Sequence, residues 1–218
     1  MWIAATLIAA LAQTGRNAAQ AGLTARIGTL GATGVRFLFG LPFAVLFLVA
    51  VAQAAPLPAL TAPAAGWALV GALAQIAATA LMLSAMQRRG FAVATALVKT
   101  EPLTLALMGA AVLAEPLGPA RLGAIATATL GVLLLSGGGW QRAGGRPVAL
   151  AVAAGALFGL SALGFRAAIL ALGEGPSVAR ASVVLVLALA IQTLLIGGWL
   201  AARDRRALRG MASAWRES

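Results

Sequence analysis

Unbroken apolar runs, each about as long as a lipid bilayer is thick, dominate this sequence of 218 residues. We distinguish seven of them, at 2–21, 31–53, 64–86, 91–113, 118–137, 147–172 and 177–202. A helix crosses the hydrocarbon core with roughly 20 residues. Lipid offers no hydrogen-bond partner to an open sheet edge, so only helices suit such segments. The sequence therefore predicts an all-α integral membrane protein, folded as a multi-span helical bundle.

The composition removes most catalytic chemistries. Hydrophobic residues make up 61% of the chain and charged residues 10%, and neither histidine nor cysteine occurs. Without imidazole or thiolate there is no histidine relay, no cysteine nucleophile and no metal site built from these ligands. No Walker-type phosphate loop is present either. We therefore expect a protein that is not an enzyme and that holds no metal or other cofactor.

The net charge of +11 has a simple interpretation in a membrane protein. The arginines scatter between the apolar runs, so they serve better to set orientation than to bind nucleic acid, which we do not expect as a partner. Loops after the odd-numbered segments hold most of them, including Arg26, Arg88, Arg142 and Arg205. The positive-inside rule then places these loops in the cytoplasm and the N terminus outside.

Four polar residues share one face of the first segment. Gln13, Arg16, Asn17 and Gln20 follow the i, i+3, i+4, i+7 spacing of a helix. A polar stripe inside a membrane must face protein or water, so we predict that it lines a cavity. The alternative is that Arg16 extends to the membrane interface.

The fourth segment carries charges near its middle, at Lys99 and Glu101, followed by Pro102. Each such charge costs about 2.5–3.5 kcal/mol on insertion scales, so charges at this depth usually have a function. Glu101 is the only acidic residue within a predicted span, which makes it a candidate for proton coupling, cation binding or charge balance with Lys99. The alternative is a fixed ion pair with Arg16 or Arg36. Pro102 removes a backbone hydrogen bond and is the expected helix hinge.

Other polar residues inside the spans have two interpretations each. Arg36 and Arg166 either face the cavity or extend to an interface. Gln75 and Gln192 either line the same cavity or form an interhelical hydrogen bond. We include Gln75 and Arg166, together with Lys99 and Glu101, among the candidate cavity residues.

A weak internal repeat links the two ends of the chain. A shift of 150 residues places Arg16 on Arg166, and a shift of 144 places Arg36 on Arg180. The sixth and seventh segments would then repeat the first and second, five helices later. An odd number of helices puts the two copies in opposite orientations, as in many secondary transporters.

The middle of the chain resembles a known family. The features, in order, are a Glu-Pro step at Glu101-Pro102, an acidic residue at Glu115 and two glycines at Gly123 and Gly131. Together with the sequence Arg36-Phe37-Leu38 they resemble the EamA-type repeat of the drug/metabolite transporter superfamily. The resemblance extends over residues 1 to about 202.

The resemblance implies ten helices, arranged as two inverted five-helix repeats around a central cavity. We assign residues 1–137 to the first repeat, 138–146 to a loop and 147–218 to the beginning of the second repeat. The second repeat would consist of two helices and a basic loop, so we expect it to be incomplete in this chain. The resemblance also implies cytoplasmic termini, in contrast to the arginine distribution.

The function implied is that of a permease or exporter in the inner cell membrane, which moves small metabolites or drugs by alternating access. Its partners would be a small-molecule substrate, the lipid bilayer and a coupling ion such as a proton, with a homodimer as an option. Arg16, Lys99 and Arg166 would suit a carboxylate or phosphate group. The alternatives are a nonfunctional or regulatory membrane fragment and a lipid-modifying membrane enzyme.

Overall fold

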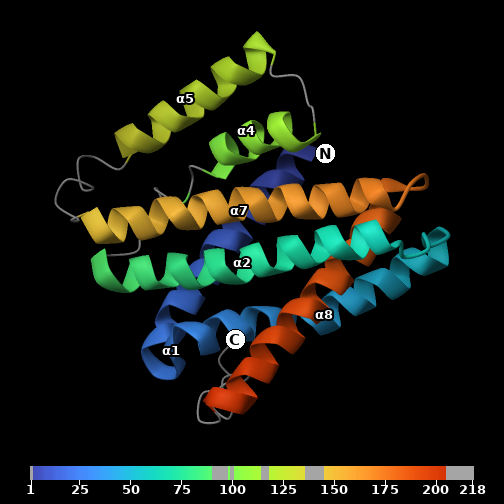
Figure 1. Ribbon diagram of the computed structural model, residues 1–218, viewed down its shortest axis with the longest axis horizontal. Helices are drawn as coiled ribbons and strands as arrows, with labels where there is room; N and C mark the ends of the chain where they lie inside the picture. The colour runs from blue at the N-terminus through green and yellow to red at the C-terminus, as the bar shows by residue number, and fades with distance from the viewer. Residues whose placement is uncertain (1, 90–97, 99–100, 114–117, 136–144, 205–218) are drawn as a thin grey trace.

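Helices form all of the regular structure in the described part of the chain. The computed structural model describes residues 2–89, 98, 101–113, 118–135 and 145–204 (Figure 1). Its helices are α1 (Trp2–Ala54), α2 (Ala62–Arg89), α4 (Glu101–Leu113), α5 (Pro119–Leu135), α7 (Gly145–Ala171) and α8 (Ser177–Arg203). The predicted all-α, multi-span bundle is confirmed.

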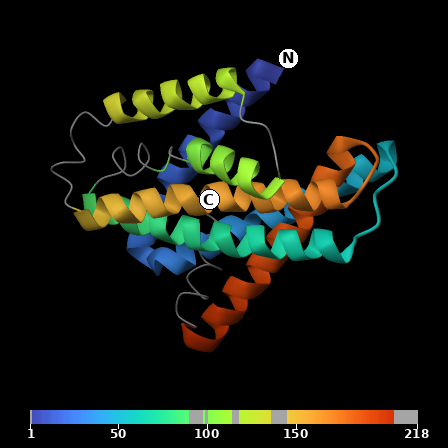
Figure 2. The same ribbon diagram turned by 45° about the horizontal axis from the view of Figure 1, so that its top comes forward.

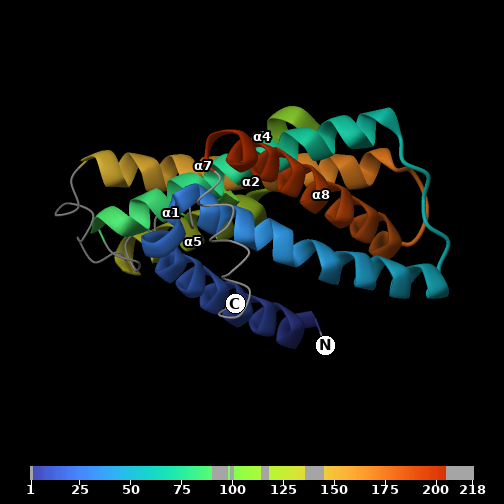
Figure 3. The ribbon, with the colours of Figure 1, turned by 90° about the horizontal axis from the view of Figure 1, so that it is seen from below.

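Helix α1 consists of two arms that meet at Gly28. The backbone angles there, φ 74° and ψ 169°, are not helical. Glycine adopts a positive φ at no steric cost, so the chain changes direction within one residue. The first arm (residues 2–27) and the second arm (residues 29–54) form a V (Figure 3). The expected loop around Arg26 is therefore wrong, because this residue lies in the last turn of the first arm.

Four helical segments of the described residues are long and apolar enough to cross a membrane. They are Arg26–Ala54, Ala62–Gln87, Val148–Ala171 and Ser177–Arg203. They correspond to the second, third, sixth and seventh predicted segments. The first predicted segment forms the first arm of α1, and the fifth corresponds to α5, with 17 residues. The fourth is described only at Val98 and in α4.

Glycines let α2 and α7 pack with their backbones in contact. A Cβ atom on Gly164 of α7 would lie 2.8 Å from the backbone nitrogen of Gly71 in α2. The two helices lie side by side along most of their length (Figures 1 and 2). At one end the Thr61 hydroxyl donates a hydrogen bond of 3.0 Å to the carbonyl of Ala171. Close approach through small residues is the usual way in which helices associate in lipid.

Helix α4 packs against α7 in the same way. A Cβ atom on Gly159 would lie 2.9 Å from the Cβ of Thr104 and 3.0 Å from the backbone nitrogen of Leu105. Figure 2 shows α4 resting along α7. This contact brings the beginning of α4, with Glu101, into the bundle.

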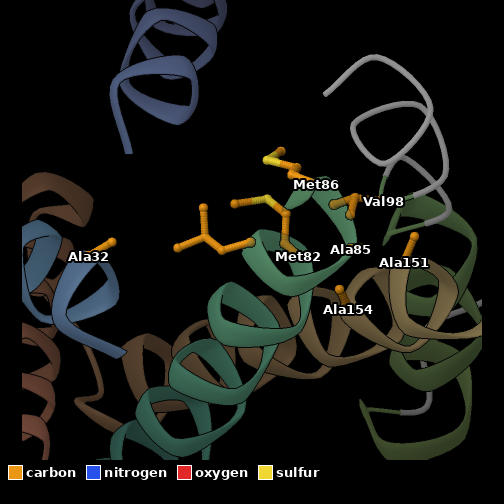
Figure 4. Packing of buried hydrophobic residues seen from close by; sticks show 8 residues of the cluster. Ala32, Met82, Ala85, Met86, Val98, Ala151 and Ala154 are labelled. Carbon is orange, nitrogen blue, oxygen red and sulfur yellow. The ribbon is translucent and has the colours of Figure 1, made fainter. Parts of the chain in front are cut away.

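The second arm of α1 completes the bundle by packing on α8 and α2. Phe37 and Val35 form a buried cluster with Ile196 and Leu200 of α8. A second cluster joins α1, α2, α7 and Val98, and includes Ala32, Met82, Met86 and Ala154 (Figure 4). Outward-facing residues such as Leu46 and Leu194, 66% and 74% exposed, suit contact with lipid tails. The helices α1, α2, α7 and α8 thus surround the interior of the protein.

Candidate functional site

A cavity of about 1210 Å³ opens between α1, α2, α7 and α8. Both arms of α1 contribute to its lining, from Gly15 to Arg26 in the first arm and from Val35 to Phe47 in the second. The V shape created by Gly28 therefore builds most of its wall. Ligand pockets usually measure about 300–1,000 Å³, so this cavity has room for a metabolite.

Three arginines, Arg16, Arg26 and Arg36, line the cavity, and no acidic residue of the described chain lines it. The half-buried Arg36 donates from Nη1 to the Thr79 hydroxyl at 3.4 Å, which joins the second arm to α2. It interacts electrostatically with Arg16, unfavourably, and with Glu101, favourably. Like charges held together in a low-dielectric site attract a negatively charged ligand.

Arg36 also lies beside an aromatic ring. Its guanidinium carbon is 5.7 Å from the ring centre of Phe37, within the range of a cation–π contact. The lining contains five phenylalanines, which we call the phenyl wall: Phe37, Phe39, Phe43, Phe47 and Phe165. Such a wall offers contacts to an apolar or aromatic part of a ligand.

Glutamines link the cavity helices to one another. Gln192 of α8 donates from Nε2 to Oε1 of Gln75 in α2 at 2.7 Å. Gln20 donates from Nε2 to the carbonyl of Ala32 at 3.2 Å, so it bridges the two arms of α1 across the kink. Gln20, Gln75 and Gln192 all line the cavity. One of these hydrogen bonds holds the two arms of α1 together, and the other joins α2 to α8.

The four polar residues of the first segment lie in different surroundings. Arg16 and Gln20 line the cavity, as the stripe predicts. Asn17 is buried but is not part of the lining, and Gln13 is exposed outside it. The two predictions for Gln75 and Gln192 describe the same arrangement, because the pair both lines the cavity and forms an interhelical hydrogen bond.

The charged residues of the fourth segment lie beside the cavity or outside the described residues. Glu101 is half-buried and Pro102 exposed, at the start of α4 as described, and neither belongs to the lining. Lys99 lies outside the described residues, and the predicted charge balance between Lys99 and Glu101 therefore stays a prediction. The same holds for the hinge at Pro102, because the turn before this proline includes residues outside the described part of the chain. The favourable interaction of Glu101 with Arg36 agrees with the alternative in which an arginine balances this carboxylate.

The residues that line the cavity also differ from the predicted cavity residues at two arginines. Arg166 is exposed on α7 and is not part of the lining, whereas Arg26 is. The signal for Arg26 was present: Gly15, Ala19, Gly22 and Arg26 follow the i, i+4, i+7, i+11 pattern of one helix face. With the first segment predicted to end at residue 21, Gly22 and Arg26 fall outside that helix, and the sequence does not reveal the shared face.

These features define a class of protein, a multi-pass α-helical membrane protein with an open, arginine-lined cavity between its helices. The model of the EamA-like transporter family matches residues 1–137, and the chain belongs to this family. It is therefore a membrane transporter of the drug/metabolite superfamily. No curated protein and no solved structure matches the chain. The family match ends where the predicted first repeat ends, and the division into two repeats stays a prediction.

Proposed function

We propose that this chain is a secondary transporter that binds a small metabolite in the cavity and moves it across the cytoplasmic membrane by alternating access. The observation that carries the proposal is the cationic cavity itself, about 1210 Å³ in volume and bounded by helices of a transporter family member. Charged residues within membrane helices are costly unless they face water or a partner, and they usually mark a substrate pathway.

The charge of the lining supports an anionic substrate. Arg16, Arg26 and Arg36 come from both arms of α1, so a carboxylate or phosphate can be held between the arms. Guanidinium groups suit such groups because their N–H donors match the acceptor oxygens. In counterflow experiments, competition by organic anions should exceed competition by cations of similar size. The opposite ranking would contradict an anionic substrate.

Arg36→Gln tests whether the cavity is the transport site. Purified wild-type protein and the variant are reconstituted into liposomes, and uptake of labelled candidate metabolites is measured. We expect the variant to lose at least about tenfold in flux, because it removes a charge-assisted contact with the substrate worth about 1.5–3 kcal/mol. The matched control is Arg203→Gln, the same change at an exposed position in the last turn of α8; its flux should equal that of the wild type.

The outcomes separate this proposal from its alternatives. Equal loss of flux in both variants would mean that overall charge, rather than the cavity, matters. Absence of protein-dependent flux for every metabolite class would contradict transport and favour a nonfunctional or regulatory membrane protein.

A further inference from the structure

The residues that line the cavity are segregated by polarity along its length. Those with a charge or an amide group are Arg16, Gln20, Arg26, Arg36, Gln75 and Gln192. On α2, Gln75 and Thr79 lie one helical turn apart on the same face. The first accepts a hydrogen bond from the glutamine of α8, and the second accepts one from Arg36. Arg16 interacts electrostatically with Arg36, so both arms of α1 contribute to this polar end of the cavity.

The second arm of α1 extends the lining from Arg36 into an apolar end. The lining continues on the same helix face four, seven and eleven positions further along, at Gly40, Phe43 and Phe47. At 1.5 Å per residue, Phe47 lies about 16 Å along the helix from Arg36. Phe43 is 73% exposed and Phe47 49% exposed, so a ligand in the cavity can contact both rings.

Helices α7 and α8 form the other walls of this apolar end. A Cβ atom on Gly40 would lie 3.6 Å from a methyl carbon of Leu189, so α8 runs beside the second arm. The end of the second arm and the start of α8 lie on the same side of the molecule (Figure 3). In this part of the cavity α7 and α8 contribute only apolar residues, namely Phe165, Ile169, Ala181, Val184, Leu185, Ala188 and Leu189.

A ligand that fills such a cavity needs the same separation between its own groups. An acid group matches the guanidinium groups of the polar end. A second polar group at the apolar end would lose its hydration without a partner among the described lining residues, which is costly. An apolar tail gains from burial instead, by about fourfold in affinity for each methylene.

We propose that the cavity binds single-tailed amphiphilic anions. The acid group lies against Arg16 and Arg36 at the polar end, and the apolar tail extends along the phenyl wall toward Phe47. This proposal rests on the proposed function, since it names the substrate chemistry of the same cavity. A lipid-derived acid with an acyl tail and a free aromatic acid share this chemistry.

Five probes test the proposal: butanesulfonate, octanesulfonate, 3-phenylpropanesulfonate, octanol and octyltrimethylammonium. Saturable binding to the purified full chain in nanodiscs is measured by titration calorimetry, with empty nanodiscs as the background. Octanesulfonate should bind at least about thirtyfold more tightly than butanesulfonate, because its longer tail buries more methylenes. It should also bind at least about tenfold more tightly than octanol and octyltrimethylammonium, which lack the acid group. The tighter of octanesulfonate and 3-phenylpropanesulfonate identifies an acyl or an aromatic tail.

Two variants should each weaken a different preference. Leu185→Asn places an amide at the apolar end, so it should reduce the advantage of octanesulfonate over butanesulfonate at least about tenfold. Arg36→Gln should instead act mainly on the advantage of octanesulfonate over octanol. Leu194→Asn, on α8 at an exposed position outside the lining, should keep both wild-type preferences. If Leu185→Asn does not fold, Phe43→Ala decides, with the exposed Leu46→Ala as its control.

Several results would overturn the inference. Equal affinities for butanesulfonate and octanesulfonate would show that the apolar end holds no tail. Equal or tighter binding of octanol or octyltrimethylammonium would show that the arginines hold no acid group. Equal effects of Leu185→Asn and Leu194→Asn would assign the tail preference to the bilayer, and absence of saturable binding would reject the site.

The proposed function fails separately. An ionised sulfonate is costly to move through hydrocarbon, so protein-dependent flux of the same probes can be measured in proteoliposomes. Binding that depends on both the acid and the tail, without flux of octanesulfonate, would uphold the selectivity and reject transport. Flux of anions without any tail preference would do the reverse.

Discussion

Arg36 is the residue on which the interactions of the cavity converge. It contacts Thr79 on α2, lies beside the ring of Phe37, and interacts electrostatically with Arg16 and Glu101. An arginine within a membrane-spanning segment needs such partners, because an isolated charge in hydrocarbon is costly. Its position therefore depends on three helices at once, and changes on any of them alter the cavity charge.

Glu101→Gln should stop transport while expression and folding stay intact. Glu101 lies outside the cavity lining, and its negative charge interacts favourably with Arg36. A neutral amide at this position would leave the positive charge of Arg36 without that interaction. Flux in proteoliposomes and the amount of folded protein after purification check this expectation. Glu174→Gln, the same change at an exposed position in the α7–α8 turn, serves as control. Unchanged transport in Glu101→Gln would show that this carboxylate has no part in the cycle.

At the residue scale, helical spacing predicts part of the site. Spacing alone places Arg16 and Gln20 on one face with Gln13 and Asn17, but a helix face is wider than the wall of a cavity. Only the packing of the second arm decides which residues of that face line it. The pair of Gln75 and Gln192 is separated by 117 positions, so its hydrogen bond depends on tertiary structure that one sequence does not contain.

At the scale of the elements, the contact between α2 and α7 depends on glycine. A Cβ atom on Gly71 would lie 2.6 Å from the ring of Phe165, and one on Gly164 would lie 3.0 Å from the carbonyl oxygen of Trp67. A side chain at Gly164 would meet the backbone of α2 and force the helices apart, whereas one at Gly71 would displace the ring of Phe165. The apolar runs predict where these helices lie, because membrane-length segments leave no other option. They do not predict which glycines make contacts, since alanine-rich surfaces are nearly interchangeable.

Gly164→Ala should destabilise the protein by about 1–3 kcal/mol, the usual cost of adding atoms to a well-packed interface. Unfolding by a denaturing detergent in mixed micelles measures the change. Gly198→Ala on α8 is the control, because nothing lies within 4 Å of an added Cβ there. The control should be neutral or slightly stabilising, since alanine favours the helix over glycine. Equal stability of both variants would contradict the close approach of α2 and α7.

At the scale of the whole molecule, two kinds of surface are exposed in the isolated chain. One lines the cavity and includes Ala19, and the other is the apolar periphery, which includes Leu194. In a membrane, we expect lipid to cover the second surface and water to reach the first. The arrangement of the helices that separates the two surfaces could not be predicted from the sequence. The predicted repeat partners, the second arm of α1 and α8, do lie against each other, but their inverted symmetry stays a prediction.

Thiol labelling tests this division without background, because the chain contains no cysteine. Ala19→Cys in the membrane-embedded protein should react with water-soluble methanethiosulfonates, and Leu194→Cys, although 74% exposed in the isolated chain, should not. The arginines of the cavity should also make the anionic sulfonatoethyl reagent react faster with Ala19→Cys than the cationic trimethylammonium reagent. Equal rates for the two reagents, or equal labelling of both sites, would contradict a cationic, water-filled cavity.

The kink at Gly28 makes the first arm of α1 a lever. The arm contains residues 2–27, and at 1.5 Å per residue it is about 39 Å long. A rotation of about 10° at this pivot would move its far end by about 7 Å, a displacement larger than one helical turn. A Cβ atom on Gly28 would meet no heavy atom within 4 Å, so no neighbouring residue crowds the pivot itself. The hydrogen bond from Gln20 to Ala32 spans the angle of the V close to the pivot, where a small change in length corresponds to a large change in the width of the cavity.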